Sequence, residues 1–486
     1  MKLLPLNRFY SMAEEERDLA NGYFRYLQDV TFTTRQIKQV QNTTLATDDR
    51  SIRATVNVAG VVWGLGRVSS GDAHDKLWNL NTGVGYSTAD INLASKLKPF
   101  LVYDYTNNCI YYDHGNFIAK FRLSDNNNDG AWCSLTGGLQ GGQMWQGAPW
   151  GWLGQTLYNI DTTNGNEAAK NVIPTGQTLV KLVPLGSNLG IICNAGSSDT
   201  SNMYLIDGTN LNSFVDIIPI GKGVVAGGEI IDGVPFVVLN STDYKTVTIK
   251  RFNGSNFETV LTYKGRANTA GTVFNFLASK VKKVNGYIYF AVLGTVPNSD
   301  NALEYFLMRY GRETVGDNYS LSVVKNFACV PTSTTFTLNT YGCEFEVLDD
   351  LDFNVIATMD MQQGTGTMKT ATSNGLYTAQ PGVVETAIIT GGDSHIDKKF
   401  VGFTTMCDPL TIGQSITVKC KVNADTDWTT CATLSTVGTI SQETLNIEAT
   451  GANLPHWKEL KRRDELLGGA KLTGAIIKYE ETNNTI

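Results

Sequence analysis

The sequence predicts an all-β protein: a β-propeller of roughly seven blades, preceded by an N-terminal arm and followed by a β-sandwich. Three observations lead to this expectation: hairpin patterns that recur around glycine turns, apolar runs between those hairpins, and a strictly alternating stretch near the C-terminus. We expect residues 1–49 to form the arm, 50–361 the propeller, 362–382 a linker and 383–486 the sandwich.

The hairpin pattern is clearest at residues 247–261, where apolar residues alternate on both sides of Asn253-Gly254. Asn-Gly accepts positive φ at both central positions of a tight turn, so it predicts a two-residue connection there. The same order of strand, glycine turn, aromatic residue and strand recurs at residues 110–123, 203–217 and 306–324.

Apolar runs of the kind that suit strands buried on both faces lie between these hairpins. They occur at residues 56–65, 149–157, 189–193, 234–239, 287–293 and 353–357. Runs and hairpins together recur about every 40–55 residues, which is the period of a four-stranded propeller blade. An all-β protein with hairpins but no propeller is the alternative.

The composition of the chain disfavours several classes of function. The 486-residue chain has 17% charged residues and a net charge of -7, which disfavours binding to nucleic acid. No apolar run is long enough to span a membrane, so membrane insertion is not expected, and the first residues lack the apolar region of a secretory signal. The eight cysteines form no Cys-x-x-Cys pair, and we expect them to be reduced and half-buried in strands.

The two ends of the chain differ from its middle. The sequence S-M-A-E at residues 11–14 fits a capping box and predicts a short helix over residues 12–20, followed by an extended segment at 23–32. The arm is either a flexible leader or a segment that docks on a neighbouring subunit. Residues 362–382 are rich in Gly, Thr and Ser, which is typical of a linker.

The sandwich prediction rests on a regular alternation. At residues 412–422, the side chains of Ile416, Val418, Cys420 and Val422 fall on one face of a strand. Residues 457–467 carry charges that suit a helix, but their setting among strands favours a strand.

The densest aromatic segment carries Trp145, Trp150 and Trp152 among glycines. Indole rings held flat near a backbone can stack on sugars, so these three are candidate glycan-binding residues. The alternative, which we favour, is that the rings fill space between blades.

A candidate calcium loop lies just before the tryptophans. Asp125, Asn127 and Asp129 stand at positions one, three and five of such a loop, and Gly130 follows at position six. The twelfth position holds Thr136 in place of the usual acid. A calcium-binding hairpin loop and an Asx-rich turn are the two interpretations; no other cofactor is expected.

Catalytic constellations are lacking in the sequence, so an enzyme is not expected. Asp349, Asp350 and Asp352 form a carboxylate cluster of the kind that cleaves glycosidic bonds at a suitable separation. A solvated turn is the favoured interpretation of this cluster.

Two regions together resemble a known group of proteins. They are the middle, with A-W-C-S-L-T-G-G and I-K-R-F-N-G-S-N-F-E-T-V-L, and the end, with I-G-Q-S-I-T-V-K-C-K-V and K-L-T-G-A-I-I-K-Y-E-E. A propeller followed by a sandwich with these segments resembles virion proteins of tailed bacteriophages, either tail-fibre-associated propellers or the tail nozzle below the portal.

The resemblance implies a non-enzymatic structural protein of the virion, assembled in the host cytoplasm. Its partners would be copies of itself, other virion proteins and a host-surface glycan. A carbohydrate-binding or capsule-depolymerising propeller is the first alternative, and a cellular interaction propeller is the second.

Overall fold

The computed structural model describes residues 2–6, 11–12, 23–28, 30–32, 36–40, 43–45, 51–67, 75–91, 98–135, 137–195, 200–265, 276–295, 303–312, 319–327, 343–349, 354–359, 369–373, 377, 381–386, 388–391, 395–423, 425, 427–445 and 456–482. Every regular element in these residues is a β-strand, which confirms the all-β prediction. The predicted helix over residues 12–20 lies almost wholly outside them.

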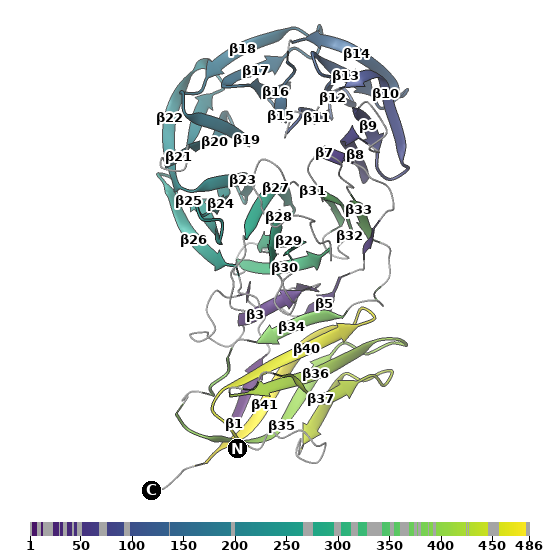
Figure 1. Ribbon diagram of the computed structural model, residues 1–486, viewed down its shortest axis with the longest axis vertical. Helices are drawn as coiled ribbons and strands as arrows, with labels where there is room; N and C mark the ends of the chain where they lie inside the picture. Colours follow the sequence, from purple (N-terminus) through teal and green to yellow (C-terminus); the bar gives the residue numbers. More distant parts are fainter. Residues whose placement is uncertain are drawn as a thin grey trace.

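A ring of antiparallel four-stranded sheets forms the larger part of the molecule (Figure 1). Seven such sheets lie in the described residues, and within each of the first six the strands follow chain order. The sheets are β7 (Ser51–Val58), β8 (Val61–Arg67), β9 (Asp75–Asn79) and β10 (Val84–Ile91); β11 (Leu101–Asp104), β12 (Cys109–Asp113), β13 (Phe117–Arg122) and β14 (Asn127–Ser134); β15 (Gln140–Trp145), β16 (Ala148–Leu153), β17 (Thr156–Ile160) and β18 (Glu167–Val172); β19 (Gln177–Leu185), β20 (Asn188–Ala195), β21 (Thr200–Asp207) and β22 (Asn210–Lys222); β23 (Val224–Ile231), β24 (Val234–Asn240), β25 (Thr246–Phe252) and β26 (Phe257–Lys264); β27 (Leu277–Val284), β28 (Tyr287–Thr295), β29 (Leu303–Gly311) and β30 (Ser320–Asn326); and β31 (Cys343–Asp349), β32 (Asn354–Met359), β33 (Lys369–Ser373) and β6 (Thr43–Leu45).

The first strand of each sheet lies at the centre of the ring. These strands contact one another in sequence around the ring, from β7 through β11, β15, β19, β23 and β27 to β31, and β31 contacts β7 again. The last strands lie outside, where β10 contacts β14 and β18 contacts β22. This radial arrangement of four-stranded sheets is that of a β-propeller, as the sequence predicts.

The apolar runs of the sequence correspond to the second strands of the sheets. The runs at residues 189–193 and 234–239 lie in β20 and β24, whose side chains are almost all buried on both faces. The hairpins at 203–217, 247–261 and 306–324 join third and fourth strands. The hairpin at 110–123 instead joins the second and third strands, β12 and β13, so the two patterns mark successive positions in only three of the sheets.

The turn predicted at Asn253-Gly254 is longer than two residues. Phe252 pairs with Phe257, which leaves a four-residue connection. The Asn253 carboxamide oxygen accepts hydrogen bonds from the backbone N–H groups of Ser255 and Asn256, at 3.1 and 3.0 Å, and of the two predicted turn residues only Gly254 has positive φ. The side chain of Asn253 thus stabilises a wider turn, and the predicted conformation of Asn253 was wrong.

Two asparagines join consecutive sheets by the same contact. Asn194, on β20, donates to the carbonyl of Val225 at 3.2 Å and accepts from its N–H at 2.5 Å. Asn240, on β24, makes the equivalent pair of bonds with Ala278, at 2.9 and 2.8 Å. In both cases the partner is the second residue of the next sheet's central strand.

Two further sheets form a unit beside the ring. The first contains β38 (Ser441–Leu445), β35 (Lys398–Cys407), β41 (Lys471–Glu481), β5 (Ile37–Gln39) and β4 (Val30–Phe32), with β1 (Lys2–Leu6) paired to β41 and β39 (His456–Trp457) paired to β35. The second contains β2 (Ser11–Met12), β3 (Tyr23–Gln28), β34 (Gly382–Thr386), β40 (Leu460–Leu467), β36 (Ser415–Val422) and β37 (Thr429–Leu434). We call this the two-sheet unit.

The predicted alternation and the strand at residues 457–467 are both confirmed. In β36, Ile416, Val418, Cys420 and Val422 are buried, and the residues between them are partly exposed. Residues 457–467 contain the end of β39 and all of β40, and β40 pairs with β36 along its whole length.

The inner face of β40 carries a buried ion pair. The guanidinium of Arg462 donates from Nη2 and Nε to the Asp464 carboxylate, at 2.7 and 2.9 Å, and Nη2 also donates to Thr405 Oγ1 at 2.8 Å. The guanidinium carbon lies 5.2 Å from the ring centre of Phe403. Both charged residues are almost inaccessible to solvent.

The described strands of residues 1–49 belong to the chain's own sheets. β1, β4 and β5 lie in one sheet of the two-sheet unit, β2 and β3 lie in the other, and β6 is the outer strand of the ring's last sheet. The described strands of this segment are thus hydrogen-bonded within the chain and do not extend from it as an arm. Part of the predicted linker is likewise a strand, since β33 pairs with both β32 and β6.

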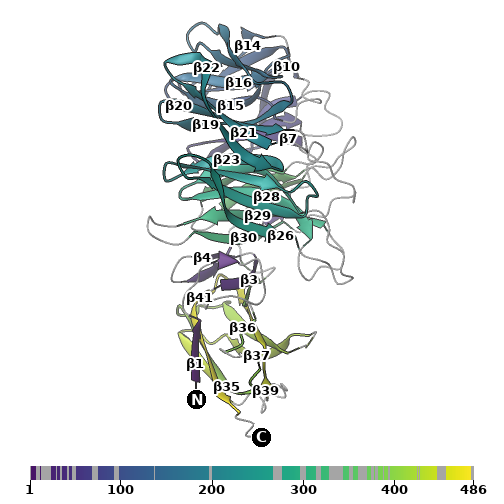
Figure 2. The same cartoon turned by 90° about the vertical axis from the view of Figure 1, so that its left-hand side faces the viewer.

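The two-sheet unit lies against one side of the ring (Figure 2). β30 of the ring contacts β2, β3 and β4 of the unit. One continuous cluster of buried apolar side chains includes Phe290 and Val323 of the ring together with Val384 and Trp457 of the unit. Strands from the N-terminal segment thus fill the junction.

Candidate functional site

Charged side chains gather where the central strands of the ring approach one another. Lys181 comes from β19, Glu229 from β23, Lys280 and Lys282 from β27, and Glu344 and Glu346 from β31. Lys98 stands just before β11. We call these seven residues the central charge cluster.

Four of the central strands share a local irregularity that shapes this cluster. The strand register shifts by one residue at Arg53, Val180, Ala226 and Lys280, each close to the start of its strand. Such a bulge leaves one backbone residue without its usual ladder partner. Lysines supply two of the missing partners: Lys280 Nζ donates to the Arg53 carbonyl at 3.0 Å, and Lys98 Nζ donates to the Val180 carbonyl at 3.3 Å.

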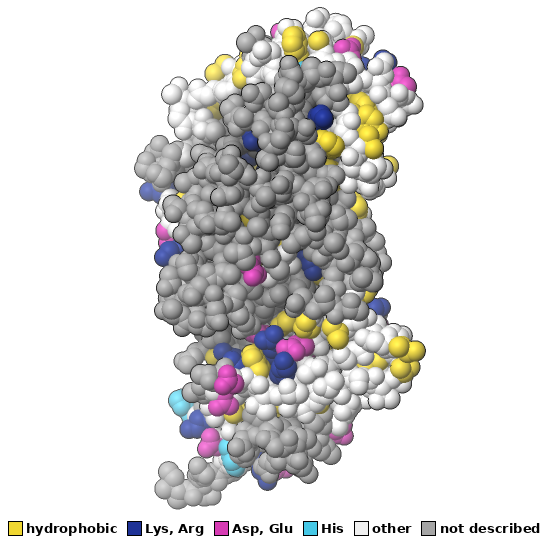
Figure 3. Space-filling model, turned by 45° about the vertical axis from the view of Figure 1, so that its right-hand side comes forward, with side chains coloured by type: hydrophobic (Ala, Val, Ile, Leu, Met, Phe, Trp, Pro, Cys, Tyr) yellow, Lys and Arg dark blue, Asp and Glu magenta, His cyan; other side chains and the backbone are white. Residues whose placement is uncertain are grey.

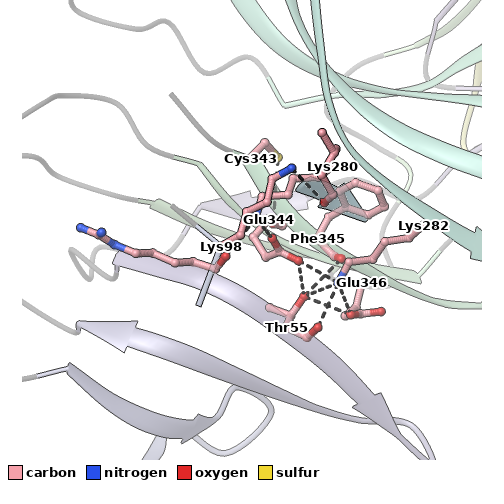
Figure 4. Close-up of polar contacts among 10 residues, drawn as sticks. Thr55, Lys98, Lys280, Lys282, Cys343, Glu344, Phe345 and Glu346 are labelled. Carbon is pink, nitrogen blue, oxygen red and sulfur yellow. Dashed lines mark hydrogen bonds and ion pairs between the residues drawn. The ribbon is translucent and has the colours of Figure 1, made fainter. Parts of the chain in front are cut away.

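Lys282 lies at the most crowded point of the cluster (Figure 4). Its ammonium group contacts Glu344 Oε1 at 2.7 Å and Thr55 Oγ1 at 2.7 Å, and it is also paired with Glu346. The Thr55 hydroxyl lies 3.0 Å from a carboxylate oxygen of both glutamates. One ammonium and one hydroxyl therefore hold two carboxylates of the same strand close together.

Glu344 has a second cation. Its Oε2 lies 2.9 Å from Lys280 Nζ, so each of its oxygens faces a different lysine. Burial by itself raises the pKa of Glu344, but Lys280 and Lys282 outweigh that effect and lower the pKa to about 2. Burial by itself lowers the pKa of Lys282, but Glu344 and Glu346 outweigh it and raise that pKa above its usual value. Both groups are therefore charged at neutral pH and act as a structural ion pair.

Lys98 behaves differently from its neighbours. Burial lowers its pKa, and the positive charges of Lys280 and Lys181 lower it further, to about 7. Lys181 has its own carboxylate partner, since its Nζ lies 2.7 Å from Glu229. The charge of Lys98 can thus change near neutral pH.

The three candidate tryptophans lie in the core of the ring. Trp145, Trp150 and Trp152 are 4%, 1% and 3% exposed and pack in one apolar cluster with side chains of the third and fourth sheets. The indole N–H of Trp150 donates to the carbonyl of Trp145 at 3.2 Å, and that of Trp145 donates to Gly186 at 3.3 Å. Their faces are not open to a sugar, which corrects their assignment as glycan-binding residues and supports the alternative that they fill space.

The candidate calcium residues lie on an exposed hairpin between β13 and β14. Asp125 accepts a hydrogen bond from the N–H of Asn127 at 3.1 Å and pairs with Arg122 at 3.3 Å. Asn127 and Asp129 stand opposite Arg122 and Lys120 in the strand register. An arginine therefore occupies the position beside Asp125 where a cation would bind. The described residues contain no group of three or more His, Cys, Asp or Glu side chains placed to hold a metal ion.

The remaining candidate residues are the aspartates near β31 and the cysteines. Asp349 ends β31, whereas Asp350 and Asp352 lie outside the described residues. Seven cysteines are free within the described ranges, and all are buried rather than half-buried as expected from the sequence: Cys109, Cys133, Cys193, Cys343, Cys407, Cys420 and Cys431. Among those same residues, no helix has the length and apolar character needed to cross a bilayer.

Sequence reasoning missed the central charge cluster. A signal for it does exist, because two apolar strands carry like charges at alternating positions, K-V-K at residues 280–282 and E-F-E at 344–346. Opposite charges spaced alike on two buried strands indicate that these strands face one another across a shared site.

Comparisons with known proteins report the fold alone. No family model matches the chain, and no curated protein matches it. Among solved structures, the chain is similar to Hsv2 of Kluyveromyces lactis, with 11% identity over 62% of this chain and 98% of that one and a TM-score of 0.37. It is also similar to the WD40 domain of coronin from Toxoplasma gondii, with 12% identity over 76% and 85% of the two chains and a TM-score of 0.36. Scores this low add nothing to what the strand order shows.

Proposed function

We propose that the chain is a structural component of a bacteriophage virion, part of the tail as a fibre-associated or nozzle-like propeller, and that it is not an enzyme. In this proposal the seven four-stranded sheets are seven blades and the two-sheet unit is a β-sandwich. The sequence resemblance supplies the starting point. Its partners are other copies of itself, neighbouring virion proteins and a host-surface glycan.

The observation that carries the proposal is the course of the N-terminal strands. β6 completes the last sheet of the ring, whereas β1 to β5 hydrogen-bond into both sheets of the two-sheet unit. β2, β3 and β4 also contact β30 of the ring. A short segment thus links both parts through backbone hydrogen bonds, which suits a rigid building block better than a pair of mobile domains.

Exposed apolar side chains on the two-sheet unit support a role in assembly. Ile412, Val437 and Ile440 are 92%, 61% and 59% exposed. They lie on neighbouring loops, because Gly438 N–H donates to the Leu410 carbonyl at 2.8 Å. Figure 3 shows hydrophobic side chains gathered at the right-hand edge of the lower part of the molecule. Such groups are typical of protein contact sites.

The test is the location of the protein in purified particles of the phage that encodes it. Mass spectrometry of the particles should detect the chain at a fixed copy number, and an electron-microscopy image of particles labelled with an antibody should place it on the tail. Failure to find it in particles, or its presence in infected cells only as a free monomer, would rule the proposal out.

A paired substitution links this test to the structure. Ile412→Ser with Val437→Ser should leave the melting temperature nearly unchanged, because exposed apolar side chains contribute little to folding. Incorporation into particles should fall. Val172→Ser is the matched control, since Val172 is 60% exposed on the rim of the ring, and it should be incorporated normally.

A further inference from the structure

The side chain of Lys98 connects separate sheets at the centre of the ring. Its backbone carbonyl accepts a hydrogen bond from Gly141 N–H at 2.7 Å, which fixes the residue beside β15. Its ammonium group reaches the carbonyl of Val180 on β19. Lys181 directly follows Val180 in β19, and Lys280 reaches the Arg53 carbonyl on β7, so amines from three different sheets lie around the centre of the ring. The charges of Lys181 and Lys280 both act on Lys98.

Among the described residues, lysines outnumber carboxylates at this point. Lys181 is paired with Glu229 at 2.7 Å, and Lys280 is paired with Glu344 at 2.9 Å. Lys282 is paired with both Glu344 and Glu346. The four lysines of the cluster therefore face three carboxylates, and Lys98 is the lysine without a carboxylate partner within the described residues. Its hydrogen bond to one carbonyl uses one of three N–H donors.

The backbone geometry also directs Lys280 toward the central strand β7, where its amine donates to the Arg53 carbonyl at 3.0 Å. Lys280 has a φ of 46°, in the left-handed region that residues with a side chain rarely adopt. It is the extra residue of the bulge in β27, so the strand is bent at the residue that carries the amine. A conformation of this kind often marks a position where a side chain is aimed at a functional partner.

We propose that the centre of the ring binds a small tetrahedral oxyanion, of the phosphate or sulfate class, between Lys98, Lys181 and Lys280. The anion accepts the free N–H donors of Lys98 and pairs with the charge that Lys98 carries when it is protonated. Charge-assisted hydrogen bonds to oxyanions are the strong contacts that lysine ammonium groups make in proteins. This site is independent of the proposed role in a virion.

Binding is coupled to protonation of Lys98. The charged groups that act on it are Lys181 from β19, Lys280 from β27 and Glu344 from β31. Without the anion, burial and the neighbouring lysines hold the pKa of Lys98 at about 7, so the amine is mostly neutral at pH 8. An adjacent dianion favours the charged amine, and binding at pH 8 therefore takes up about one proton.

The experiment uses the full chain and inorganic phosphate. The melting temperature is measured in phosphate and in sodium chloride of the same ionic strength. Calorimetric titration at pH 8 in buffers of different ionisation enthalpy gives the number of protons taken up. We expect phosphate to raise the melting temperature of the unsubstituted chain above its value in chloride, with proton uptake on binding.

The variants separate this site from general surface binding. Lys98→Met should abolish both the phosphate-dependent rise and the proton uptake. Lys222→Met is the matched control, because Lys222 is an exposed lysine on the outer strand β22, and it should keep both effects. The same rise in Lys98→Met as in the unsubstituted chain would overturn the proposal. So would the absence of a phosphate effect, or of proton uptake, in the unsubstituted chain, a result that needs no variant to fold.

Discussion

Asn240 and Ala278 exchange two hydrogen bonds across the boundary between consecutive sheets. The carboxamide N–H donates to the Ala278 carbonyl at 2.9 Å, and the Ala278 N–H donates back to the carboxamide oxygen at 2.8 Å. All four atoms are buried, and the side chain acts as a short piece of backbone that joins one sheet to the next.

Replacing this asparagine should destabilise the ring. Asn240→Ala leaves a buried N–H and a buried carbonyl without partners, and each such group costs about 1–3 kcal/mol. We expect urea denaturation to show a loss of roughly 2–4 kcal/mol. Asn256→Ala, in the exposed turn after β25, is the control and should change stability by less than about 0.5 kcal/mol. Equal effects of the two substitutions would show that the contact between sheets is unimportant.

Glu344 should be the most sensitive member of the central charge cluster. Glu344→Gln leaves Lys280 and Lys282 with one carboxylate fewer in a buried setting, and breaking a buried pair in this way costs about 3–5 kcal/mol. Glu258→Gln, at an exposed pair with Arg251, should cost less than about 1 kcal/mol. Chemical denaturation at neutral pH compares the two variants, and a small effect at Glu344 would contradict the expected result.

The lowered pKa of Glu344 predicts how the stability of the chain depends on pH. The pKa of Glu344 is lowered to about 2 in the folded chain, from an ordinary value of 4.5. Its ion pairs therefore contribute fully above pH 4.5, and this contribution is lost as the pH falls toward 2. The stability difference between the unsubstituted chain and Glu344→Gln should shrink over that interval. A difference that stays constant with pH would mean that Glu344 is not held ionised by the lysines.

Lys98 should give a dependence of the same sign in a higher pH range. Its pKa falls from 10.5 to about 7 on folding, so the unfolded chain binds more protons between these values. Stability should therefore rise with pH over this window, in the absence of phosphate. Lys98→Met should lack this rise, because the substitution removes the titrating amine; it also leaves the Val180 carbonyl without its donor. The same rise with pH in Lys98→Met would contradict the expected result.

Arg462 and Asp464 allow a double substitution. Asp464→Asn leaves a buried guanidinium without its carboxylate and should cost about 3–5 kcal/mol. Arg462→Met combined with Asp464→Leu removes both charges and should recover most of that loss, because an apolar pair suits a site bordered by Phe403. Thermal unfolding of the single and double variants gives the comparison. A double variant less stable than Asp464→Asn would show that the ion pair is needed for more than charge balance.

Trp150 tests whether the aromatic segment is core. Its side chain is 1% exposed, and Trp150→Ala should cost about 3–5 kcal/mol through the cavity that it leaves. Trp428→Ala, at a half-buried ring between Lys421 and Arg463, should cost clearly less. If Trp150→Ala were as stable as the unsubstituted chain but no longer bound a glycan, Trp150 would be a sugar-binding residue.

The periodic parts of the fold were predictable because they follow from local pattern. The second strands of the sheets were recognisable as apolar runs, because a strand buried on both faces is apolar throughout. β36 was recognisable by its alternation, because a strand buried on one face alternates apolar and polar residues. Strand β40 was harder to predict, because Arg462 and Asp464 are charged yet face the interior. Their mutual pairing, which the sequence does not show, makes that burial acceptable.

The long-range parts were not predictable. Residues 1–49 looked like an arm because the sequences of β1, β3 and β6 do not indicate which strands they pair with. Their pairing partners are β41, β34 and β33, which lie hundreds of residues later in the chain. The central charge cluster was missed for the same reason, since Glu344 and Lys282 meet only when the ring closes. The tryptophans were conspicuous by residue type, but whether they lie inside or outside depends on the packing of neighbouring sheets.

The pairing of β6 with β33 has a consequence for the timing of folding during synthesis. β6 leaves the ribosome long before β33, and β1 leaves it long before β41, so the early strands must wait with unpaired edges until their partners emerge. Contacts between residues so far apart form slowly. We therefore expect nascent chains arrested before β31 to be open and sensitive to protease, and resistance to appear only after β41 has been released.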